Sequence, residues 1–162
     1  MKAQEVFQNY ADYIMPTYTK VPLTFVKGKG SKLWDIHNKV YLDFFPGWGV
    51  GSLGHCHPKV VQAVRDQVGK LIFVPNNYYL IQQAKLAREL IRLSFPGKVF
   101  FCNSGAEANE GAIKLSRKFG QGRFEIITFA NSFHGRTLTT ITATGQKKYQ
   151  QGFEPLPAGF KT

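Results

Sequence analysis

Cysteine, acidic residues and long apolar runs are all scarce in this chain of 162 residues. Its only two cysteines are Cys56 and Cys102, and it contains no CxxC or Cys/His cluster. A single bridge would not support a secreted fold of this size, and no ligand spacing points to a metal site. Apolar runs such as residues 125–130 are far shorter than the ~20 residues that span a bilayer. With no apolar core of a signal peptide near Met1, we expect a cytoplasmic protein without metal or membrane partners.

Positive charge is the one compositional extreme. The chain has 21 Lys and Arg against 10 Asp and Glu, a formal net charge of +11. Such a charge makes nucleic acid a candidate partner. The basic residues are nevertheless spread along the chain, and no run of five or more marks a basic arm. Because nothing besides the net charge supports nucleic-acid binding, we expect no nucleic-acid partner. An acidic remainder of a larger protein would also balance the charge.

The first third of the chain predicts a small antiparallel meander. A short helix is expected over residues 4–13, followed by strands at residues 23–26, 32–36 and 40–43, with turns between them. Residues 43–58 are rich in glycine and aromatic side chains, which is typical of a long functional loop. Helical periodicity follows, with apolar stripes Val60/Val61/Val64/Val68/Leu71 and Leu86/Leu90/Leu93.

The second half predicts a βαβ unit. Residues 98–102 and 124–129 resemble buried strands, and residues 104–119 a helix with Ala108, Ala112, Leu115 and Phe119 on its inner face. Another helix is expected to begin near Gly135. Short connections between these elements favour parallel strands with a right-handed crossover. The fold class is therefore α/β, with an N-terminal segment over residues 1–57 and the first part of a larger domain over residues 58–162.

Two ligand-type segments follow the two predicted parallel strands. Ser104, Gly105 and Ala106 stand where a helix begins, and small residues there let an anion approach free backbone N–H groups. The same residues also suit an ordinary N-cap. After the second strand, Phe133 offers a flat ring and Arg136 a bidentate partner for a carboxylate. Individually, Phe133 suits a core position and His134 a hydrogen-bonded turn. Because strand ends share one sheet edge, the two segments together indicate a binding site.

Four stretches of the chain resemble the class III (subgroup II) aminotransferases of pyridoxal-phosphate (PLP) fold type I. They are LGHCHPKVV at residues 53–61, NSGAEANE at 103–110, FHGRT at 133–137, and the segment from Tyr149 to residue 160. They span essentially the whole chain in the family's order. The resemblance implies the fold-type-I architecture, here as a meander plus the first part of a mainly parallel large domain, and it implies a homodimer.

The resemblance also implies roles for individual residues. Ser104, Gly105 and Ala106 would bind the cofactor phosphate, and Phe133 would stack on the pyridine ring. Arg136 would pair with the α-carboxylate of the substrate. Trp48, in the glycine-rich loop, would border the distal end of the substrate. Gly51 departs from the family, because many relatives have Asn there.

The implied activity is transfer of an amino group between N-acetylornithine and 2-oxoglutarate, a step of arginine biosynthesis. The family's Schiff-base lysine lies beyond the equivalent of Thr162, and no lysine of this chain stands in a matching context. No catalytic residue is therefore assigned within the chain, which we expect to be inactive alone, as the N-terminal part of an aminotransferase. The alternatives are another ω-aminotransferase, acting on ornithine, 4-aminobutyrate or succinylornithine, and a non-catalytic binding module.

Overall fold

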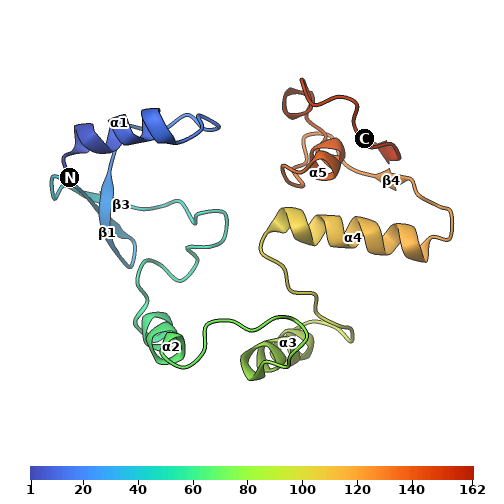
Figure 1. The fold of residues 1–162 in the computed structure, drawn as a ribbon, viewed down its shortest axis with the longest axis horizontal. Helices are drawn as coiled ribbons and strands as arrows, with labels where there is room; N and C mark the ends of the chain where they lie inside the picture. The colour runs from blue at the N-terminus through green and yellow to red at the C-terminus, as the bar shows by residue number, and fades with distance from the viewer. The chain divides into compact units, whose positions relative to one another are not determined.

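The computed structural model describes all 162 residues and divides them into two compact units, Met1–Tyr78 and Tyr79–Thr162 (Figure 1). No helix combines the length and apolarity that crossing a membrane requires. The division into a segment of residues 1–57 and a domain of residues 58–162 stays a prediction.

The first unit contains the predicted meander. Helix α1 (Ala3–Tyr13) precedes strands β1 (Phe25–Lys29), β2 (Lys32–Asp35) and β3 (Val40–Leu42), and helix α2 (Pro58–Val68) follows them. The strands pair antiparallel in the order β1-β2-β3, so the predicted meander is confirmed. In this sheet, a short connection joins each strand to the next, as antiparallel pairing allows.

Asp35 organises the turn between β2 and β3. Its carboxylate accepts hydrogen bonds from the backbone N–H groups of His37 and Lys39 and from the Tyr41 hydroxyl, each at 2.9 Å. Burial of this carboxyl opposes ionisation, but the three hydrogen bonds outweigh it and lower the pKa of Asp35. The turn is thus built around a buried, ionised and fully partnered side chain.

The glycine-rich loop is ordered by its own turns. The carbonyl of Pro46 accepts from the N–H groups of Gly49 and Gly51, at 3.1 and 2.9 Å. The Phe45 and Trp48 rings meet edge to face, with centroids 5.3 Å apart. Trp48 itself is 90 % exposed. The predicted long irregular loop is therefore a succession of hydrogen-bonded turns that presents an indole on its surface.

The second unit mixes helices with a parallel pair of strands. Its elements are α3 (Ile81–Leu93), α4 (Gly105–Phe119), β4 (Ile126–Ile127), α5 (Leu138–Ala143), the 3₁₀ helix η1 (Lys147–Tyr149) and β5 (Phe160–Lys161). Strands β4 and β5 are parallel, and α5 packs against both α4 and β5. The side chains buried here are Ile113, Thr128, Thr140, Ile141, Ala143 and Thr144. An antiparallel sheet and a parallel pair make the fold α/β, as predicted.

The predicted βαβ unit is wrong in detail. Residues 98–102 form no strand, and Phe100 is 70 % exposed. The strand expected at residues 124–129 is reduced to β4, and its parallel partner is β5. A strand persists only where a neighbour satisfies its backbone N–H and C=O groups, and residues 98–102 have no such neighbour in this chain.

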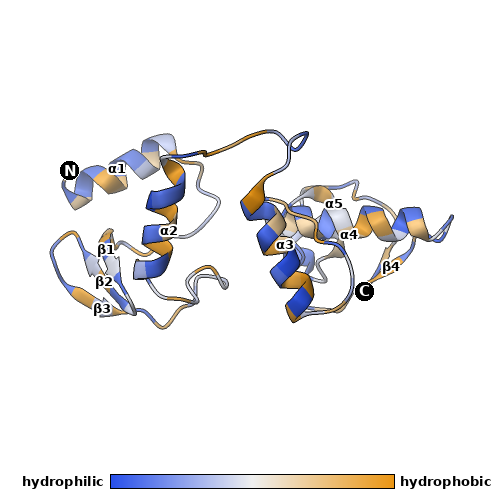
Figure 2. Ribbon diagram, turned by 90° about the horizontal axis from the view of Figure 1, so that it is seen from below, coloured by the Kyte–Doolittle hydropathy of each residue, from blue (hydrophilic) through white to orange (hydrophobic).

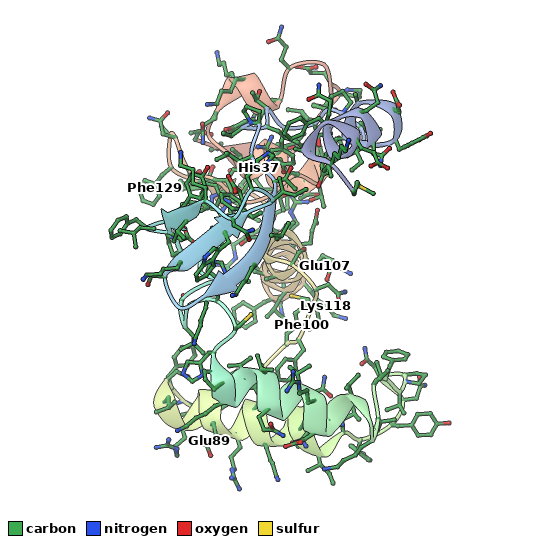
Figure 3. All side chains as sticks on the ribbon, turned by 90° about the vertical axis from the view of Figure 1, so that its left-hand side faces the viewer. His37, Glu89, Phe100, Glu107, Lys118 and Phe129 are labelled. Atoms are coloured by element: carbon green, nitrogen blue, oxygen red, sulfur yellow. The ribbon has the colours of Figure 1, made fainter.

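The apolar helix faces also differ from the prediction. Figure 2 shows alternating hydrophobic and hydrophilic bands along α2, α3 and α4, so the amphipathic pattern is real. On α4, however, Ile113 is buried whereas Leu115 and Phe119 are 70 % and 80 % exposed. Phe129, after β4, also projects away from the ribbon (Figure 3). Periodicity identifies an apolar stripe, but burial needs a packed neighbour, and for α4 that neighbour is α5.

Candidate functional site

The N-terminus of α4 is capped by Ser104. Its Oγ accepts from the backbone N–H of Glu107 at 3.1 Å, and its carbonyl accepts from Ala108 at 3.0 Å. The Glu107 carboxylate accepts from the backbone N–H of Asn103 at 2.6 Å. Glu107 lies in the first turn and Lys118 in the last, which suits the helix dipole. The ordinary N-cap that the sequence also allowed is therefore present.

The cap leaves two backbone donors free. The N–H groups of Gly105 and Ala106, in the first turn of this 15-residue helix, have no acceptor in the structure. A Cβ built on Gly105 would meet no atom within 4 Å, so the space over this turn is open. Two free N–H groups at the positive end of a helix dipole can hold a phosphate. Capping and anion binding are compatible here, because they use different N–H groups.

The segment after β4 packs directly on this turn of α4. Gly135 approaches so closely that a Cβ there would lie 2.8 Å from Ala106 Cβ and 2.6 Å from Thr140 Oγ1. Its φ of +138° is one that side-chain-bearing residues rarely adopt. The Asn109 amide donates to the His134 carbonyl at 2.7 Å, so α4 and the segment are also joined by a hydrogen bond. Glycine at position 135 thus allows two segments that are distant in sequence to meet.

Polar side chains behind the segment hold its backbone. Thr144 Oγ1 accepts from the His134 N–H at 3.0 Å, and Gln146 Nε2 donates to the Ser132 carbonyl at 2.9 Å. His134 is hydrogen-bonded through its backbone, as expected, but it lies in no turn. The segment is therefore tied to α4 on one side and to the end of α5 on the other.

Arg136 and Phe133 are presented from this segment. Phe133 is 56 % exposed, so it is not the core aromatic that its residue type also allowed. The Arg136 guanidinium lies 5.3 Å from the centroid of the Phe133 ring and forms neither an ion pair nor a hydrogen bond. Its five donors are consequently available to an external carboxylate.

Five of the predicted site residues share one compact unit. Ser104, Gly105, Ala106, Phe133 and Arg136 lie in the second unit, on segments that are in contact. Trp48 lies in the first unit, and its assignment stays a prediction.

Sequence reasoning missed three residues that hold this arrangement: Asn109 and Thr144, through the hydrogen bonds above, and Tyr149, whose ring centroid lies 4.1 Å from Arg136 Cζ. Asn109 and Tyr149 stand inside stretches that carry the family resemblance, a signal that could have singled them out. Thr144 had no such signal, because its role depends only on tertiary contact.

The family model for class-III aminotransferases matches residues 13–162. Acetylornithine aminotransferase of Caldanaerobacter subterraneus is 54 % identical over 154 residues, 92 % of this chain and 39 % of the relative. Acetylornithine aminotransferase of Methanothermobacter thermautotrophicus is 53 % identical over 161 residues, 99 % of this chain and 41 % of the relative. The chain thus spans about two fifths of the length of the curated relatives it matches.

Solved structures give the same result. Ornithine aminotransferase from Toxoplasma gondii superposes with a TM-score of 0.93 at 28 % identity, over 99 % of this chain and 40 % of that one. Taurine:2-oxoglutarate aminotransferase from Bifidobacterium kashiwanohense, solved with PLP and glutamate, superposes with a TM-score of 0.87 at 29 % identity, over 99 % and 37 %. With its model matching nearly the whole chain, the family is established: this chain belongs to the class-III aminotransferases.

Proposed function

We propose that this chain provides the phosphate- and carboxylate-binding part of a PLP-dependent enzyme that transfers an amino group between N-acetylornithine and 2-oxoglutarate. The choice of substrate is supported by curated relatives at about 50 % identity that are acetylornithine aminotransferases. The observation that carries the proposal is the contact of Gly135 with Ala106. It brings the free N–H groups of α4 and the segment bearing Arg136 into one folded unit.

The residues present fit the cofactor. The N–H groups of Gly105 and Ala106 and the hydroxyl of Ser104 would hold its phosphate at the positive end of α4. The exposed ring of Phe133 would cover one face of the pyridine. When bound, PLP supplies the electron sink that lets the substrate lose a proton next to its amino group.

The substrate would be held by its carboxylate. The guanidinium of Arg136 carries a permanent charge and has no protein acceptor, so it can pair with two carboxylate oxygens at once. Such pairing orients the amino group relative to the cofactor. Trp48 would border the far end of the substrate. The proposal includes that the complete enzyme is a homodimer and works in the cytoplasm.

The test is an activity assay of the complete enzyme, which contains this chain together with the part that carries the Schiff-base lysine. PLP and 2-oxoglutarate are held constant while N-acetylornithine, ornithine, 4-aminobutyrate and succinylornithine are compared as donors. We expect the highest kcat/KM with N-acetylornithine. A preference for ornithine would instead support the second candidate, which the high TM-score with ornithine aminotransferase favours.

Borohydride reduction separates catalysis from simple binding. After incubation with PLP, reduction should add one pyridoxyl group to the complete enzyme, as measured by intact mass. The 162-residue chain alone should show no such site-specific addition, because none of its lysines is in the family's context. If the complete enzyme also remains unmodified, the chain belongs to a non-catalytic binding protein. Salt-sensitive binding of mixed RNA or DNA would favour the nucleic-acid alternative.

A further inference from the structure

We propose that Tyr149 is a positioning residue for substrate binding, acting as the platform that orients the Arg136 guanidinium. The inference rests on the proposed role of Arg136. The Arg136 Cζ atom lies 4.1 Å from the centroid of the Tyr149 ring, closer than its 5.3 Å distance from the Phe133 ring. A guanidinium at this distance from an aromatic face is attracted by the ring quadrupole.

Tyr149 also contacts the ring proposed to stack on the cofactor. The centroids of Phe133 and Tyr149 are 6.2 Å apart, and their planes meet at 83°, an edge-to-face arrangement. Tyr149 thus touches both side chains that would face the bound molecules. Because the two rings and the guanidinium form one cluster, removing Tyr149 would leave Arg136 with only the more distant Phe133 ring.

The backbone around Tyr149 is held firmly enough to serve this purpose. Gln146 Nε2 donates to the Ser132 carbonyl at 2.9 Å, which ties the start of η1 to the segment bearing Phe133. On the other side of Tyr149, Gln150 Nε2 donates to carbonyls at the end of α5, including Thr144 O at 3.0 Å. Both flanking glutamines therefore anchor the short helix that carries the ring.

The ring of Tyr149, and not its hydroxyl, carries the effect. The hydroxyl has no hydrogen-bond partner in the structure, whereas the ring contacts Arg136, Phe133 and the Lys148 ammonium, the last at 4.8 Å. A stacked guanidinium loses few of its donors, because it interacts with the ring through its face. The N–H groups around its edge therefore stay available to a carboxylate.

The test compares Tyr149→Leu with Tyr149→Phe in the complete PLP-loaded enzyme. We expect Tyr149→Leu to raise the KM for N-acetylornithine roughly 3- to 30-fold while kcat changes much less. Tyr149→Phe should restore the KM, because it keeps the ring. Tyr79→Leu is the matched control, since Tyr79 is fully exposed in the same unit and makes no ring or cation contact.

Two further measurements separate positioning from a general structural defect. The dissociation constant of glutarate, a dicarboxylate that is not transaminated, should rise by the same factor in Tyr149→Leu when measured by calorimetry. In an Arg136→Ala background, Tyr149→Leu should add no further loss of glutarate binding, because the platform has nothing left to orient. Additive losses, or an unchanged glutarate constant in Tyr149→Leu, would overturn the inference. Inactivity of the unmutated enzyme towards N-acetylornithine would contradict the proposed function instead.

Discussion

The carboxylate of Asp43 and the imidazole of His55 close the glycine-rich loop, with Asp43 Oδ2 2.6 Å from His55 Nε2. Asp43 Oδ1 also accepts from the Phe45 N–H at 3.0 Å, and the backbone of His55 exchanges two hydrogen bonds with Gly30. The two ends of the loop are therefore fastened to each other and to the turn between β1 and β2. The intervening loop includes Trp48, the residue proposed to border the substrate.

This closure should make the stability of the protein depend on pH. The hydrogen bond from His55, followed by that from Phe45, lowers the pKa of Asp43 below its ordinary value near 4. The folded state therefore takes up a proton at Asp43 less readily than the unfolded state. The resulting stabilisation is complete above about pH 4 to 5 and is lost as the pH falls through the folded pKa. Thermal unfolding midpoints of the unmutated protein and Asp43→Asn, measured between pH 7 and pH 3, should converge at low pH. A constant gap between the two curves would contradict this prediction.

Gly135→Ala should destabilise the protein by about 1–3 kcal/mol. The new Cβ would lie 2.6 Å from Thr140 Oγ1 and 3.0 Å from the backbone Cα of Ala106, at a φ of +138°. Denaturant unfolding followed by circular dichroism measures the loss. Gly69→Ala is the matched control, because its φ is −78° and a Cβ there meets no atom within 4 Å. Equal stability of the two variants would show that the close approach at Gly135 is unimportant.

Arg136→Ala in the complete enzyme should lower kcat/KM for N-acetylornithine by about 100-fold, because a charge-assisted bidentate pair is lost. PLP should remain bound, since Arg136 is not proposed to hold the phosphate. Steady-state kinetics and the visible absorbance of bound PLP measure the two effects separately. An unchanged kcat/KM would remove Arg136 from the substrate site.

Phe133→Ala should weaken PLP binding about 10-fold through loss of ring stacking. The fraction of PLP retained after gel filtration measures this change, after the Schiff base has been released by a competing amine. Phe129→Ala serves as the control, because Phe129 is 85 % exposed and belongs to the same unit. Equal retention in both variants would count against stacking on Phe133.

Ser104 allows capping and phosphate binding to be separated. Ser104→Ala should cost about 0.5–2 kcal/mol of stability, because the acceptor for the Glu107 N–H is removed. Ser104→Asp keeps a capping oxygen but adds negative charge beside the free N–H groups of Gly105 and Ala106. It should therefore preserve the unfolding free energy while reducing the affinity for PLP. If Ser104→Asp binds PLP normally, the phosphate does not lie at this helix end.

Local patterns predicted the elements but not all of their contacts. The antiparallel meander and helices α1 to α4 were predicted within a few residues, because turns, caps and periodicity act over short distances. The prediction of a strand at residues 98–102 was wrong. An apolar run shows that a segment can form a buried strand, but not that a second strand is there to pair with it. The prediction that Leu115 lies on the inner face of α4 was wrong for a similar reason, because its exposure depends on what packs beside α4.

The amino-acid sequence by itself determined the helix start at Ser104, the glycine at position 135 and the aromatic and basic residues available to a ligand. Only the tertiary structure decided that Gly135 meets Ala106 and that Arg136 stacks on Tyr149, 13 positions further along the chain. The physical reason is the distance along the chain over which each interaction acts. Capping and turn chemistry depend on neighbouring residues, whereas a site at the meeting of two segments depends on how the intervening chain returns.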